Sequence, residues 1–147
     1  MKSLIRSILI KILPTKNAYA HCDIPCGIYD PKPAQLAAAT VLKMVQLIQE
    51  LSKENPTVND RNKFVRYVST KEEHARKCKE EILILWTDYF KPEHLKTIPH
   101  LHEIFWNAAK LCSLNKQEVS LAHATELVKA VDEIAAIFQK TKVTSKK

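Results

Sequence analysis

Apolar residues recur at spacings of three and four along four successive segments of this 147-residue chain. That spacing is the period of an amphipathic α-helix, which buries one apolar stripe. The first predicted helix opens at Asp30-Pro31, an N-cap followed by a proline in the first turn, and ends at Asn55-Pro56. Its apolar stripe consists of Ala37, Val41, Met44, Ile48 and Leu51.

A second, longer pattern runs from Thr57 to Tyr89. Lys71 is the only break in its apolar face. The other members of that face are Phe64, Val68, Ala75, Cys78, Ile82, Leu85 and Tyr89. The sequence therefore predicts one long helix with aromatic residues at its end.

Two further helices follow a turn around Lys91-Pro92 and Pro99. The third carries Leu101, Ile104, Phe105, Ala108 and Leu111 on its apolar face. Asn115 and Glu118, three residues apart, predict a capping box that opens the fourth helix. The apolar stripe of the fourth helix consists of Leu127, Val131, Ile134 and Phe138.

Four such helices with short connections predict an all-α fold, an up-down-up-down four-helix bundle. A single glycine and 46% hydrophobic residues agree with one helical domain that has a real core. Bundles that bind two metal ions in their core use a Glu-x-x-His motif on two helices, and the sequence contains no such motif. We therefore expect a plain apolar interior and any metal chemistry outside it.

The net charge of +7 is concentrated at the N-terminus. Lys2, Arg6, Lys11 and Lys16 supply four of these charges, and no acidic residue precedes His21, which leaves +3 for the remainder. No cluster of Lys and Arg interleaved with aromatic residues follows, so we expect no nucleic-acid partner. A mildly positive surface remains compatible with a small anionic substrate.

Residues 1–20 read as a processed leader that is too short and too charged for stable membrane insertion. Ala18-Tyr19-Ala20 is an A-x-A pattern of the kind that signal peptidases cut, which leaves export open. Cys78 and Cys112 read as free thiols, which favours the cytoplasm. In either compartment the cut is expected directly before His21, by a processing protease.

The segment from His21 to Cys26 offers an imidazole and two thiols within six residues. These ligands suit zinc, copper or nickel, and their spacing does not choose between them. After cleavage, the free amine of His21 with the amide nitrogen and thiolate of Cys22 can close two fused chelate rings. Cys26 then completes a plane, and the His21 side chain can reach an axial position. A loop closed by a Cys22–Cys26 disulfide is the alternative.

Two blocks of the sequence resemble the nickel superoxide dismutases: the string from His21 to Pro31, and Leu85 to His94 with Pro99-His100-Leu101-His102 after it. The resemblance extends from His21 to about Lys142. It implies a homohexamer of four-helix bundles with one nickel ion per subunit. The implied reaction converts superoxide to dioxygen and hydrogen peroxide by Ni(II)/Ni(III) cycling.

Carried over by position, the resemblance implies that His21, Cys22 and Cys26 bind the metal. Asp23 would hold this hook together by hydrogen bonds. The resemblance further implies that Tyr29 and Tyr89 line a small opening above the metal and that Lys91 draws in the anion.

Two positions depart from the pattern of some family members, which carry a Glu and an Arg that support the axial imidazole. The matching residues here are Ala37 and His74. We expect His74 to take over part of this role, because an imidazole ligand normally needs an outer partner. The remaining histidines are expected on the surface or in packing contacts: His94, His100, His102 and His123.

The expected organisation is a leader at 1–20, a metal-binding hook at 21–30, a bundle at 31–142 and a basic tail at 143–147. Two functions compete with the enzyme. One is a nickel- or copper-binding or delivery module without turnover. The other is a structural helical oligomer whose N-terminal loop is closed by a disulfide.

Overall fold

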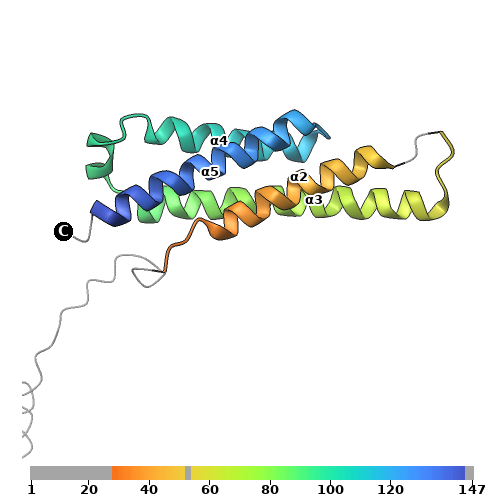
Figure 1. The fold of residues 1–147 in the computed structure, drawn as a ribbon, viewed down its shortest axis with the longest axis horizontal. Coiled ribbons are helices and arrows are strands. Elements are labelled where there is room, and N and C mark those ends of the chain that lie inside the picture. The colour runs from red at the N-terminus through yellow and green to blue at the C-terminus, as the bar shows by residue number, and fades with distance from the viewer. Residues whose placement is uncertain (1–27, 52–53, 145–147) are drawn as a thin grey trace, which may run out of the picture.

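The computed structural model describes residues 28–51 and 54–144 and consists of four long helices (Figure 1). They are α2 (Lys32–Glu50), α3 (Val58–Ile84), α4 (Leu101–Gln117) and α5 (Leu121–Thr144). A π-helical turn, η1 (Leu85–Tyr89), continues α3, and a 3-10 turn, η2 (Pro92–Lys96), precedes α4. The described residues contain no strand, and the all-α prediction is confirmed.

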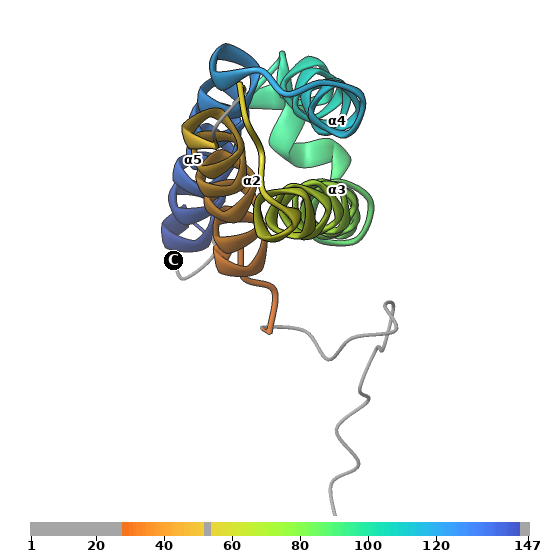
Figure 2. The same cartoon turned by 90° about the vertical axis from the view of Figure 1, so that its right-hand side faces the viewer.

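The four helices stand at the corners of a bundle seen end-on in Figure 2. Each helix packs against the next one in the chain, and α2 also packs against α5, which closes the ring. The core contains side chains from all four helices, including Val41, Ile82, Phe105 and Val131. None of the helices in the described part of the chain is both long and apolar enough to cross a membrane.

Helix α2 begins as the sequence predicts and ends earlier. The Asp30 carboxylate accepts a hydrogen bond from the Lys32 amide at 2.9 Å, which caps the first turn. The helix ends at Glu50 because the next residue, Leu51, is extended. The predicted end at Asn55-Pro56 is therefore too late by one turn.

Helix α3 opens with a capping box. The Thr57 hydroxyl accepts from the Asp60 amide at 3.2 Å, and the Asp60 carboxylate accepts from the Thr57 amide at 3.0 Å. These hydrogen bonds from Thr57 lower the pKa of Asp60. Phe64, expected in the core, is instead 47% exposed. Because α2 and α3 extend beyond the turn between α4 and α5, this part of α3 has fewer helices to pack against (Figure 1).

Lys71 is buried, with 1% of its surface exposed. Its ammonium donates to the backbone carbonyls of Asn115, Lys116 and Glu118, the last two at 3.2 and 3.1 Å. The final carbonyls of a helix lack partners within it, and Lys71 supplies one for the end of α4. The break in the apolar stripe of α3 is therefore a cap for another helix.

The predicted capping box at Asn115 and Glu118 is wrong. Asn115 is a buried residue of α4, and its amide group donates to the carbonyls of Leu111 and His123 at 2.9 and 3.0 Å. Helix α5 begins after Ser120, whose hydroxyl accepts from the His123 amide at 3.3 Å. A spacing of three also occurs inside helices, so the pattern alone could not separate the two positions.

Candidate metal centre

The predicted metal ligands His21, Cys22 and Cys26, and the supporting Asp23, lie outside the described residues. The description begins at Ile28, two residues after Cys26. Within residues 28–51 and 54–144, no group of three or more His, Cys, Asp or Glu side chains could hold a metal ion. The structural neighbourhood of the hook is therefore defined by the residues that directly follow it.

Tyr29 is buried at the foot of α2, with 7% of its surface exposed. Its ring faces that of Tyr89, with 5.7 Å between ring centres and 60° between the planes. On its other side Tyr29 borders a cavity of about 110 Å³, together with Asp30, Glu81 and Leu85. The structure thus brings together the two tyrosines that the sequence predicts to act together.

The π turn η1 determines where Tyr89 points. The Phe90 amide donates to the Leu85 carbonyl at 3.1 Å, a hydrogen bond that spans five residues instead of four. Tyr89 then packs on Phe138 of α5 at 4.4 Å between ring centres, while Phe90 packs on Phe105 of α4 at 5.3 Å. Two adjacent aromatic residues therefore reach two different helices.

The hydroxyl of Tyr89 is fixed by α5. It lies 2.9 Å from the hydroxyl oxygen of Thr141. The Thr141 hydroxyl donates its hydrogen to the Phe138 carbonyl at 2.8 Å, which leaves Tyr89 as the donor to Thr141. The orientation of the Tyr89 ring and that of its O–H group are both set by one turn of α5.

Lys91 and His94 lie close to Tyr89 in sequence but differ in position. The His94 ring stacks on Tyr89, and its Nδ1 accepts from the Lys91 amide at 2.9 Å, so it is a packing residue. The exposed Lys91 lines a separate cavity of about 340 Å³ with Trp86 and His102. The structure therefore does not bring the Lys91 side chain to the tyrosine pair.

The other histidines are distributed along the bundle. His102 accepts from the Trp86 indole at 2.8 Å, exposed His100 lies 3.6 Å from Glu103, and half-buried His123 lies 3.2 Å from Glu118. His74 is half-buried on α3, and its Nδ1 has no hydrogen-bond partner among the described residues. His74 is therefore the histidine whose polar atom the bundle itself leaves unsatisfied.

Lys142 is a residue at this site that the sequence analysis did not single out. Its ammonium donates to the backbone carbonyl of Tyr29 at 3.3 Å and lies 4.5 Å from the centre of the Phe138 ring. Thr141 was missed as well. Both lie three or four residues after Phe138, on the apolar stripe of α5, and polar residues in such positions were the available signal.

Comparisons with known proteins agree on one family. The sequence profile of the nickel-containing superoxide dismutases matches residues 16–142. Relatives named as superoxide dismutases of the nickel type, from Streptomyces seoulensis and Streptomyces coelicolor, are each 35% identical over 130 residues. These alignments cover 88% of this chain and 93% of each relative.

Solved structures give the same result. The native 1.30 Å structure of a nickel superoxide dismutase matches with a TM-score of 0.72 at 31% identity, covering 83% of this chain and 99% of the other. An apo structure of a nickel superoxide dismutase matches with a TM-score of 0.70 at 28% identity, covering 79% and 98%.

Proposed function

The chain belongs to the family of nickel-containing superoxide dismutases, and from this premise we propose how its own residues bind the metal and admit the substrate. It is an enzyme that converts superoxide to dioxygen and hydrogen peroxide, and its cofactor is nickel. The roles of individual residues are our proposal.

We propose that the His21 amine and imidazole, the Cys22 amide nitrogen and thiolate, and the Cys26 thiolate bind one nickel ion per subunit. This donor set fits the metal, because nitrogen and thiolate ligands in a plane suit Ni(II). When bound, nickel supplies one-electron chemistry between its +2 and +3 states. Anionic thiolate and amide donors favour the higher state.

The leader, residues 1–20, would prevent metal binding until it is removed. An acylated nitrogen is a much poorer donor than a free amine, so residue 20 must be cut from His21 before the site forms. A processing protease is therefore a partner of the precursor.

Tyr29 and Tyr89 would line the opening through which superoxide reaches the metal, and Asp23 would hold the hook in shape. The observation that carries this assignment is the ring contact between the two tyrosines, directly after the hook in the described chain. The Tyr89 hydroxyl, held by Thr141, can order a water or a small oxygen species beside the metal. Lys91 would add positive charge at longer range.

We further propose that His74 supports the axial imidazole of His21. Its buried Nδ1 has no hydrogen-bond partner among the described residues, and Ala37, which offers no polar group, lies on the neighbouring helix α2. His74→Ala should lower turnover and change the Ni(III) electron paramagnetic resonance spectrum. Exposed His100→Ala serves as the control. A wild-type rate and spectrum in His74→Ala would exclude the role.

We propose a hexamer and a cytoplasmic location, both following from the resemblance and the free thiols of Cys78 and Cys112. The exposed apolar tip of the α2–α3 hairpin, formed by Val58, Phe64 and Val65, offers surface for association. Native mass spectrometry should give six times the subunit mass, and Phe64→Ser should weaken the assembly. A monomer at cellular concentration, or recovery outside the cell, would refute these proposals.

The proposed metal site is tested by comparing two forms of the full chain, one that begins at His21 and one that keeps Ala20. The His21 form should bind one nickel per subunit, measured by metal analysis, and remove superoxide in stopped-flow assays. The form that keeps Ala20 should do neither, and neither should Cys22→Ser in the His21 form. Equal activity with and without Ala20 would contradict the role of the amine.

A further inference from the structure

The end of α5 contacts both tyrosines of the proposed opening. Thr141 holds the Tyr89 hydroxyl, Phe138 packs on the Tyr89 ring, and Lys142 holds the Tyr29 carbonyl. These residues come from three distant parts of the chain, and one helical turn brings them into register. The point where the hook leaves the bundle is therefore tied to α5.

The ammonium of Lys142 is held in a defined place. It donates to the Tyr29 carbonyl at 3.3 Å and lies 4.5 Å from the Phe138 ring centre, a cation–π contact. It also lies in the last turn of α5, where the helix dipole favours a positive charge. Three interactions thus fix this charge beside the tyrosine pair.

That charge is not neutralised by a carboxylate. Among residues 28–51 and 54–144, the ion pairs involve other cations, and Lys142 takes part in none of them. A fixed positive charge next to a narrow opening raises the local concentration of a small anion. Superoxide carries one negative charge, so the effect acts on the substrate of this enzyme.

We propose that Lys142 is a positioning and substrate-steering residue of the enzyme. Its hydrogen bond to the Tyr29 carbonyl fixes the exit of the hook, and its charge draws superoxide towards the Tyr29–Tyr89 opening. This inference rests on the proposed function. It differs from the role given to Lys91, whose side chain lines a separate cavity.

The first test measures the hydrogen bond itself, in the metal-free protein that begins at His21. The nitrogen of Asp30 belongs to the same peptide group as the Tyr29 carbonyl, so its ¹⁵N chemical shift reports the hydrogen bond to that carbonyl. Lys142→Met should shift this resonance, and Lys142→Arg should largely restore it. Lys129→Met, a matched change at an exposed lysine of α5, should leave it in place.

The second test measures steering in the nickel-loaded enzyme. Lys142→Met should lower kcat/KM about fivefold at low ionic strength, and the difference should shrink as salt screens the charge. The expected loss is in kcat/KM more than in kcat, with unchanged nickel content. Lys142→Arg should recover most of the rate, and Lys129→Met should behave as wild type.

An unshifted Asp30 resonance together with a wild-type kcat/KM in Lys142→Met would overturn the inference. A rate loss that is equal at all ionic strengths, and that Lys142→Arg does not restore, would also overturn it, because that result marks a purely structural lysine. A wild-type enzyme that binds nickel but does not remove superoxide would instead refute the proposed function, and the resonance test would still stand.

Discussion

The ring of Tyr29 meets the ring of Tyr89 at 5.7 Å between centres and a 60° tilt. A tilted pair at this distance is a favourable aromatic contact. One ring belongs to the segment that leaves the hook, and the other ends the long rod of α3 and η1. The pair therefore joins the metal-binding segment to the bundle.

Tyr89→Phe should keep the ring contacts and remove the hydrogen bond to Thr141. We expect a loss of about 1 kcal/mol in the free energy of unfolding, normal nickel content and slower turnover. Thr141→Val removes the same bond from the other side. In urea denaturation the two changes together should cost less than the sum of the single changes. Strictly additive losses would show that the bond contributes nothing.

Lys71→Met should destabilise the bundle by about 1–3 kcal/mol, because the carbonyls of Asn115, Lys116 and Glu118 lose a buried donor. Urea denaturation at pH 7 measures this loss. Lys63→Met, at an exposed lysine of the same helix, is the control and should change stability little.

The stability difference caused by Lys71→Met should also depend on pH. Burial lowers the pKa of Lys71 below its usual value of 10.5. Between the lowered pKa and 10.5 the unfolded chain binds more protons than the folded one, so raising the pH favours the folded wild type. The difference between wild type and Lys71→Met should widen as the pH approaches 10. A difference that narrows would contradict this sign.

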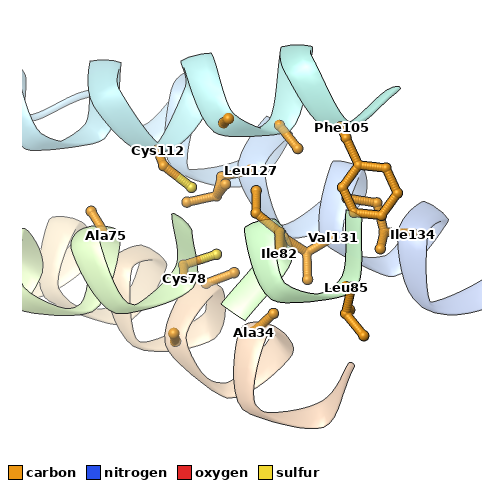
Figure 3. Close-up of a cluster of buried hydrophobic side chains, with 14 of the residues drawn as sticks. Ala34, Ala75, Cys78, Ile82, Leu85, Phe105, Cys112, Leu127, Val131 and Ile134 are labelled. Carbon is orange, nitrogen blue, oxygen red and sulfur yellow. The ribbon is translucent and has the colours of Figure 1, made fainter. Parts of the chain in front are cut away.

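Cys78 and Cys112 should resist alkylation in the folded protein. They face each other between α3 and α4 with no exposed surface (Figure 3). The hydrogen bond with Cys112, with burial, raises the pKa of the Cys78 thiol, so the reactive thiolate is disfavoured. In metal-free protein, iodoacetamide at pH 8 should modify only Cys22 and Cys26 until denaturant is added. Early modification of Cys78 in peptide mapping would show that the core opens.

Removal of nickel should leave the helical bundle intact. The described helices are held by apolar side chains, and no cluster among residues 28–51 and 54–144 could hold a metal ion. Far-ultraviolet circular dichroism of the nickel-loaded and chelator-treated protein should therefore be nearly superimposable. A large loss of helical signal on chelation would mean that the metal holds the bundle together.

The helices were predictable because each one carries a regular apolar stripe. Leu127, Val131, Ile134 and Phe138 are all buried, as the pattern of α5 predicts. The errors arose where a local pattern has more than one meaning. Asn115 and Glu118 have the spacing of a capping box but end a helix, and Phe64 continues a stripe beyond the end of its neighbouring helices.

The proposed metal ligands are contiguous in sequence, so local chemistry and the family resemblance were enough to predict them. The contacts of Thr141 and Lys142 depend on how α5 packs against distant segments, which no spacing reveals. Lys71 and Lys142 share one signal, a cation on an apolar stripe. In both cases the ammonium reaches backbone carbonyls of another element.

The wide turn of η1 has a genetic consequence. A π turn holds one residue more than an ordinary helical turn, so losing a single codon between Leu85 and Tyr89 would restore regular winding. Everything after it would rotate by about 100°, and the Tyr89 side chain would swing away from α5. Such a deletion would yield a sound helix in a crippled catalyst, which makes the length of this turn a sequence feature to inspect in any variant.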